Sequence, residues 1–258
     1  MRIVTLNVCS GVRTRLAPAA RREAEFCRRI EALDVDVVNL QEVWTPGLLA
    51  TIHAGLPSLP HVARRRGIGG QPAGGLATLS RVPVTDVRYR TFRRARVGAG
   101  GPVFRLLRSI EVGFHGVLLV TLAGEPPVLV GNVHLTANRD GDWSAGNRHH
   151  RFQAAQLALL RDATSGAGPA VLTGDFNVTS GCRLYPSIVD GWRDPFAATD
   201  PPTYQESMLP AGRRASRIDY ILVRGVDEPV GTEVLFTEPG PVGLVSDHVG
   251  LLADVPIR

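Results

Sequence analysis

The chain alternates short apolar runs, rich in Val, Ile and Leu, with longer segments in which apolar residues recur every three or four positions. The short runs are typical of buried β-strands, and the helical spacing predicts amphipathic helices that cover a sheet face. Helices are expected over residues 18–33, 46–54 and 148–163. Strands are expected over residues 2–8, 35–40, 75–80, 83–92, 109–114, 116–122, 127–134, 171–173, 218–223, 229–236 and 249–255.

The order of these elements indicates the fold class. Strands and helices interleave, but the middle of the chain is rich in hairpin-like strands. A mixed α/β protein with helices on the sheet faces fits this order better than a purely parallel sheet or a β-sandwich. No linker rich in Ser, Gly or Pro divides the 258 residues, and no internal repeat is visible. We therefore expect one domain spanning residues 1–258.

Polar side chains stand where several of these strands end. The segment Val171–Asn177 runs from a buried strand through Gly174 to Asp175 and Asn177, which can point the same way. This arrangement can hold a hard cation or a phosphate, although a plain turn uses the same residue types. The pattern recurs along the chain, and the candidate site residues are Asn7, Glu42, His134, Asp175, Asn177, Asp219, Asp247 and His248.

Oxygen-bearing side chains dominate this set, which favours Mg²⁺ or Mn²⁺ over a zinc cluster. Each residue also has an ordinary structural explanation. Asn7 can cap a turn, His134 can be a satisfied core histidine, and Asp219 can bond a backbone amide. It is their joint occurrence at strand ends that indicates a functional site.

The charge balance favours an anionic substrate. The net charge is +5, and all 29 basic residues are Arg, a residue suited to bidentate phosphate recognition. A GC-rich genome would also replace Lys with Arg, so the positive charge is the physical signal. Basic, Gly-rich loops at 64–74 and 93–101 either contact substrate or are solvated surface, and the first lacks the Lys-Ser/Thr of a phosphate-binding P-loop. The acidic segment 138–147 is expected to be a loop rather than a calcium site.

Other features bound the cellular setting. The chain has three cysteines, Cys9, Cys27 and Cys182. Their odd number argues against a disulfide framework, and their spacing does not match that of a zinc finger. No secretory signal and no transmembrane run are visible, so a cytoplasmic location is expected, unless a leader has been removed. We expect a monomer.

Seven short motifs follow one another along the chain: Thr5-Leu6-Asn7, Leu40-Gln41-Glu42-Val43, Leu79-Ser80-Arg81-Val82-Pro83, Asn132-Val133-His134-Leu135, Gly174-Asp175-Phe176-Asn177, Arg217-Ile218-Asp219-Tyr220-Ile221 and Ser246-Asp247-His248. In this order they resemble the motifs of the endonuclease/exonuclease/phosphatase superfamily. These metal-dependent phosphoesterases include pancreatic-type deoxyribonuclease, abasic-site endonucleases, neutral sphingomyelinases and inositol polyphosphate phosphatases. One such motif alone is weak, but seven in the family's order are specific.

The resemblance implies a four-layer α/β sandwich, in which two packed mixed β-sheets are flanked by helices and the site lies at one edge. It implies that Glu42, with Asn7 and Asp247, holds the principal Mg²⁺ or Mn²⁺. Asp175 and Asn177 would position the attacking water or bind a second ion, and would hydrogen-bond the phosphoryl oxygens.

The resemblance also assigns the acid–base groups. His248 would be the general base, with Asp219 setting its tautomer and stabilising the imidazolium. His134 would bind the phosphate or serve the leaving group. Deoxyribonuclease-type members pair their equivalent of His134 with a carboxylate, and no motif here supplies one.

The implied reaction is hydrolysis of an anionic phosphodiester. The segments Ser109–Leu122 and Val128–His134 look more like the sphingomyelinase-type branches than the abasic-site endonucleases, so we expect a small-molecule or lipid head-group diester. A nuclease acting on DNA or RNA is the alternative. The sequence shows neither an aromatic hairpin for a bilayer nor aromatic residues spaced for base stacking. A phosphomonoesterase, or a silent module that binds phosphate or nucleic acid, is less favoured.

Overall fold

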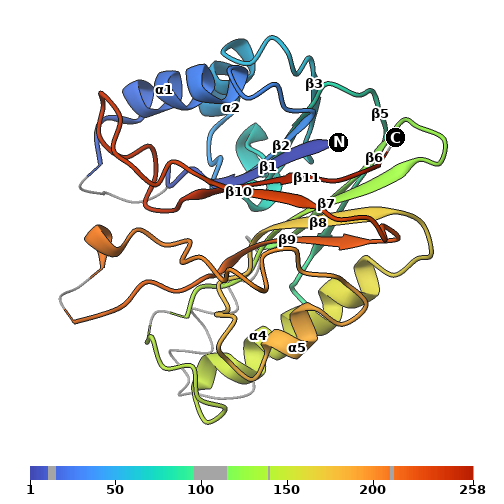
Figure 1. The fold of residues 1–258 in the computed structure, drawn as a ribbon, viewed down its shortest axis with the longest axis vertical. Helices are drawn as coiled ribbons and strands as arrows, with labels where there is room; N and C mark the ends of the chain where they lie inside the picture. The colour runs from blue at the N-terminus through green and yellow to red at the C-terminus, as the bar shows by residue number, and fades with distance from the viewer. Residues whose placement is uncertain (11–15, 96–114, 139, 210–211, 258) are drawn as a thin grey trace.

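Two β-sheets pack face to face at the centre of the molecule (Figure 1). The computed structural model describes residues 1–10, 16–95, 115–138, 140–209 and 212–257. The first sheet has the order β10 (Gly231–Leu235), β11 (Gly250–Asp254), β1 (Arg2–Asn7), β2 (Val37–Gln41), β4 (Ala77–Ser80) and β3 (His61–Ala63). The second has the order β5 (Val84–Thr91), β6 (Gly116–Leu122), β7 (Val128–His134), β8 (Ala170–Asp175) and β9 (Asp219–Arg224).

Both sheets are mixed. Each contains one parallel pair, β1 with β2 in the first sheet and β7 with β8 in the second, and the other pairings are antiparallel. Parallel neighbours end at the same edge, so Asn7 lies beside Gln41 and His134 beside Asp175. Because β9 runs antiparallel to β8, its first residue, Asp219, pairs with the last residue of β8.

Helices cover the outer faces (Figure 1). On the first sheet lie α1 (Ala19–Glu31) and α2 (Pro46–Ala54), and on the second lie α4 (Arg148–Ala163) and α5 (Tyr185–Ile188). Short 3₁₀ turns are η1 (Ile68–Gly70), η2 (Ala73–Gly75) and η4 (Glu206–Met208). None of the described helices is both long enough and apolar enough to cross a membrane.

Side-chain alternation divides the core into three apolar layers. In β1, Val4 and Leu6 pack with α1 and α2, whereas Ile3 faces the second sheet. In β8, Leu172 packs with α4, whereas Val171 faces the first sheet. Helix, sheet, sheet and helix therefore form four layers, which confirms the predicted sandwich.

The layer between the sheets becomes polar toward one edge. Asn39 Nδ2 of β2 donates to Thr173 Oγ1 of β8 at 2.8 Å, and Gln41 Nε2 donates to Asn132 Oδ1 of β7 at 2.7 Å. All four side chains are fully buried. Because a buried amide is costly unless it is hydrogen-bonded, these contacts fix how the sheets are aligned.

Several element boundaries differ from expectation. The strand expected over 75–80 begins at Ala77, because Gly74 and Gly75 take left-handed φ angles of 67° and 66° in η2. The strand β3 was not predicted, since three residues are too few to show a period. The strand expected over 109–114 lies outside the described residues.

Gly174 allows β8 to deliver Asp175 to the edge of the sheet. Its φ of 135° lies in a region that L side chains rarely adopt. A Cβ atom at this position would lie 2.0 Å from the carbonyl oxygen of Val133 in the neighbouring strand. The backbone passes too close to β7 for any residue but glycine.

We therefore expect Gly174→Ala to lower the free energy of unfolding by at least about 2 kcal/mol, through strain and steric overlap. Gly168→Ala is the matched control, because no atom of the described residues lies within 4 Å of the place that its Cβ would occupy, and its φ is not left-handed. Urea unfolding monitored by circular dichroism measures both. Equal stabilities of the two variants would contradict the prediction.

Candidate functional site

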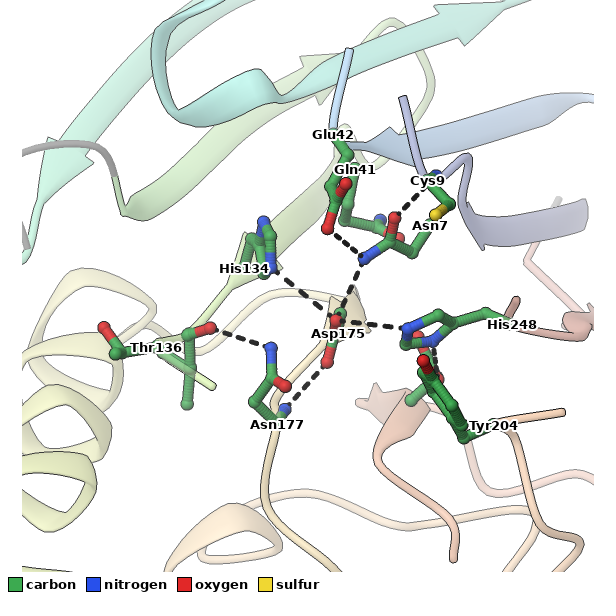
Figure 2. A network of polar contacts seen from close by, with 12 residues as sticks. Asn7, Cys9, Gln41, Glu42, His134, Thr136, Asp175, Asn177, Tyr204 and His248 are labelled. Atoms are coloured by element: carbon green, nitrogen blue, oxygen red, sulfur yellow. Dashed lines mark hydrogen bonds and ion pairs between the residues drawn. The ribbon is translucent and has the colours of Figure 1, made fainter. Parts of the chain in front are cut away.

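The strand ends bring the sequence-predicted residues together at one edge of the sandwich. Figure 2 shows Asp175 between His134 and His248, with Asn7 and Glu42 to one side and Asn177 to the other. Asn7 and Glu42 come from the ends of β1 and β2, and Asp247 and His248 immediately precede β11. The first sheet thus supplies Asn7, Glu42, Asp247 and His248, and the second supplies His134, Asp175, Asn177 and Asp219.

Asp175 is the centre of the polar contacts. Its Oδ2 lies 3.1 Å from Asn7 Nδ2, 3.6 Å from His134 Nε2 and 3.9 Å from His248 Nε2. Its Oδ1 accepts from the backbone N–H of Asn177 at 2.8 Å. Burial, followed by repulsion from Asp219, raises the pKa of this carboxyl well above its ordinary value.

His248 and Asp219 form a direct pair. The distance from His248 Nδ1 to Asp219 Oδ2 is 2.8 Å, and both residues are buried. A proton on Nδ1 satisfies Asp219 and leaves Nε2, which faces Asp175, as the basic nitrogen. Burial alone would lower the pKa of His248, but the carboxylates of Asp219, Asp175 and Asp247 outweigh it and raise the pKa to about 10.

Glu42 lies directly after β2 with a left-handed φ of 61°, an uncommon conformation for this residue type. Its Oε1 accepts from Asn7 Nδ2 at 3.3 Å, whereas its Oε2 is buried without a hydrogen-bond partner among the described residues. Asn7 turns its amide nitrogen toward both Glu42 and Asp175, and its Oδ1 accepts from the backbone N–H of Cys9 at 3.0 Å. In this orientation Asn7 holds the two carboxylates, and its role as a metal ligand stays a prediction.

Asp247 is held by Tyr204, a residue that sequence reasoning missed. The Tyr204 hydroxyl donates to Asp247 Oδ2 at 3.1 Å, and its ring meets that of His248 at 77° with centroids 5.0 Å apart. The backbone N–H of Gln205 donates to Asp247 O at 2.7 Å. Tyr204 lies between α5 and η4, in a stretch where no strand or helix period marks it.

Arg22 is a second missed residue. This buried side chain of α1 donates to the carbonyl oxygens of Val8 at 3.0 Å and Cys9 at 3.2 Å, just after β1. It also donates to Val245 O at 2.7 Å, just before the Ser246-Asp247-His248 motif. One guanidinium therefore ties together the two segments that carry Asn7 and Asp247, although helical spacing alone showed it only as a polar residue of α1.

His134 is buried at the end of β7. Burial, then the charges of His115 and His248, keep its pKa well below the ordinary histidine value, so the ring is neutral at neutral pH. Asp175 at 3.6 Å is beyond hydrogen-bond distance. His115, which the sequence did not single out, packs against this ring with centroids 4.8 Å apart.

The donor set fits a hard divalent cation. Glu42, Asp175, Asp219 and Asp247 crowd four carboxylates into one site, and no described arginine forms an ion pair with any of them. Ligand atoms of Asp175, Asp219 and His248 lie within 4.8 Å of one another. The unpartnered Oε2 of Glu42 adds a buried acceptor. Such excess negative charge, carried mainly by oxygen, is what Mg²⁺ and Mn²⁺ prefer.

Residues 4–248 match the Endonuclease/Exonuclease/phosphatase family. The chain belongs to this family. Its fold is the four-layer sandwich that the resemblance of the seven motifs implied.

Proteins with several different names are similar to this chain in sequence or in fold. A Drosophila melanogaster protein named "Putative neutral sphingomyelinase" is 26% identical over 277 residues, which cover 100% of this chain and 61% of that relative. Sphingomyelinase C from Streptomyces griseocarneus has a TM-score of 0.68 at 19% identity, over 98% of each chain. TDP2 from Caenorhabditis elegans has a TM-score of 0.73 at 17% identity, over 98% of this chain and 73% of that one. Beta toxin from Staphylococcus aureus, solved with bound magnesium ions, has a TM-score of 0.71 at 15% identity, over 98% of each chain.

Exposed arginines stand in the described parts of both basic loops. Arg64 donates to Gly70 O at 2.6 Å, which closes its own loop, while Arg65 and Arg66 are exposed. In the second loop, residues 93 and 94 are exposed and residues 96–101 lie outside the described part of the chain. Substrate contact by either loop stays a prediction.

The crowding of carboxylates around His248 predicts a measurable titration. In the metal-free protein, Asp219→Asn removes the nearest negative charge and lowers the pKa of His248 by at least about 1 pH unit. Proton–nitrogen NMR of the imidazole as a function of pH measures it. Asp162→Asn, on the exposed face of α4, is the control that leaves the titration unchanged. A pKa of His248 that is the same in Asp219→Asn and in the wild type would contradict the assigned pairing.

Proposed function

We propose that this protein is a hydrolase, a Mg²⁺-dependent phosphodiesterase in which His248, oriented by Asp219, activates the attacking water. The observation that carries the proposal is the 2.8 Å contact between His248 Nδ1 and Asp219 Oδ2, with Nε2 turned toward the carboxylate cluster. This geometry leaves one ring nitrogen free to accept a proton at the place where substrate and metal would meet.

Glu42 and Asp247, with Asn7 beside them, would hold the principal ion, and Asp175 with Asn177 would position the water or a second ion. A bound Mg²⁺ supplies Lewis acidity, which stabilises negative charge on the phosphoryl and leaving oxygens. Tyr204 fixes the carboxylate of Asp247 through its hydroxyl.

The proton transfers can be assigned to named residues. His248 Nε2 takes a proton from water as the water oxygen bonds to phosphorus, and Asp219 stabilises the imidazolium. The bond from phosphorus to the leaving oxygen breaks in line. That oxygen takes a proton from solvent, and the imidazolium of His248 returns its proton to solvent before the next turnover. His134, which lies on the opposite side of Asp175 from His248 (Figure 2), would contact the phosphoryl group.

The protonation state of His248 depends on the charges around it. Two of the carboxylates that raise its pKa, those of Asp175 and Asp247, are also among those that would bind a cation, so neutralising them lowers the pKa of His248 again. With metal bound, His248 therefore becomes neutral at a lower pH than in the metal-free protein. Because the neutral ring is the base, turnover rises with pH through the pKa of His248 in the metal-bound enzyme.

We propose a small-molecule or lipid head-group diester as substrate, supported by similarity to proteins named as sphingomyelinases. The specific observation for the nuclease alternative is the exposed pair Arg65 and Arg66 in a chain of net charge +5. A panel of sphingomyelin, a bis-aryl phosphodiester, phosphomonoesters, RNA, and single- and double-stranded DNA separates them. Turnover of DNA, with binding that weakens steeply as salt rises, would favour the nuclease.

Metal dependence is expected to rest on Glu42. Glu42→Gln weakens binding of Mg²⁺ or Mn²⁺ by about tenfold or more without unfolding the protein, because it removes one charge from a hard-cation site. Calorimetric titration of the metal, with circular dichroism for the fold, measures this. Glu238→Gln, at an exposed loop position, is the matched control. Full hydrolytic activity of metal-free enzyme in excess chelator would sink the proposal.

The His248 and Asp219 pair is expected to act as one unit. Asp219→Asn lowers kcat by about a hundredfold or more, since it removes the charge that favours the imidazolium. Replacing both residues costs little more than the worse single change. A kinetic double-mutant cycle at fixed metal concentration tests this, with folding checked for each variant. Losses that add fully in the logarithm of the rate would show that the residues act independently.

A further inference from the structure

His134 is not oriented by a hydrogen bond from its own ring. Its Nδ1 is buried without a hydrogen-bond partner among the described residues, and its Nε2 lies 3.6 Å from Asp175 Oδ2. Site histidines are usually oriented by a hydrogen bond that the second ring nitrogen makes. Something else must hold this imidazole at its place beside Asp175.

Two aromatic rings contact or flank His134. His115, immediately before β6, meets it edge to face, with centroids 4.8 Å apart and an interplanar angle of 90°. Trp44, two residues after Glu42, lies 6.4 Å away at 43°. His115 and His134 are buried, and Trp44 is half-buried.

The backbone places His115 rigidly. Gly116 pairs with His134 in the ladder between β6 and β7, so the preceding residue stands next to the end of β7. The backbone N–H of Phe92 donates to His115 O at 3.1 Å, which ties it to the end of β5 as well.

We propose that His115 is a positioning residue that holds the His134 imidazole with Nε2 facing the site. Rotation of the His134 ring about its Cβ–Cγ bond would drive its edge into the perpendicular ring of His115, whereas the observed edge-to-face geometry is favourable. Packing therefore does here what a hydrogen bond does for His248. The effect on turnover rests on the proposed function, whereas the orientation of the ring does not.

The test compares a variant that keeps an aromatic ring with one that removes it. His115→Ala is expected to lower kcat about tenfold, with KM and the metal dissociation constant within about twofold of wild type, because one ring pair supplies an effect of that size. His115→Phe restores kcat to within about twofold of wild type, since the ring that meets His134 is kept. His53→Ala, on the partly exposed side of α2, is the control that changes neither constant.

A second measurement does not depend on activity. In the metal-free protein, NMR of the His134 ring is expected to give one sharp set of resonances in the wild type and in His115→Phe, and broadened or doubled resonances in His115→Ala. If the wild type hydrolyses no diester, the proposed function fails and this spectrum alone decides the positioning role. Equal losses in the Phe and Ala variants, an unchanged kcat in His115→Ala, or a sharp single His134 ring in that variant would overturn it.

Discussion

The alignment of the two sheets depends on a buried layer of amides and hydroxyls between them. The apolar part of this interface, with residues such as Ile3 and Val171, tolerates sliding, because dispersion and area burial are not directional. The polar part does not, since moving one sheet would strip Asn39, Gln41 and Asn132 of partners across the interface. Each buried amide left unpaired costs about 1–3 kcal/mol. The site can form because these strand ends are held opposite one another.

The inward face of each central strand changes character along its length. In β8 it runs from Val171 through Thr173 to Asp175, and in β7 it ends in Asn132 and His134. Apolar contacts, neutral hydrogen bonds and ionisable groups therefore follow one another toward the edge. The neutral layer separates the charged site from the apolar core, which would otherwise face buried carboxylates at high cost. The carboxylates of the site are still desolvated and still repel one another, and a bound proton or cation relieves that repulsion.

The segments beyond the strands owe their positions to side chains that bond backbone groups. Arg22 joins the segment after β1 to the segment before β11, and Ser246 Oγ donates to Asn7 O at 2.5 Å. Thr203 Oγ1 accepts from the backbone N–H groups of Ile218 and Asp219, which sets the start of β9. These side-chain hydrogen bonds thus satisfy the backbone groups of the irregular chain where the sheets provide no ladder.

Most of the elements could be predicted from the amino-acid sequence, because strand period and helix period are local properties. The four-layer class followed from the resemblance of seven motifs, in their order along the chain, to those of a known family. Asp175 could be placed at a strand end in the same way, since Gly174 and the apolar run are adjacent in the chain. The contact partners of the site residues could not be predicted from the sequence, because those contacts form only when the chain is folded. Tyr204 on Asp247 and His115 on His134 join residues 43 and 19 positions apart, through contacts made when separate strands pack together. Such contacts leave no period in the chain, because distance along the sequence does not encode proximity across a sheet.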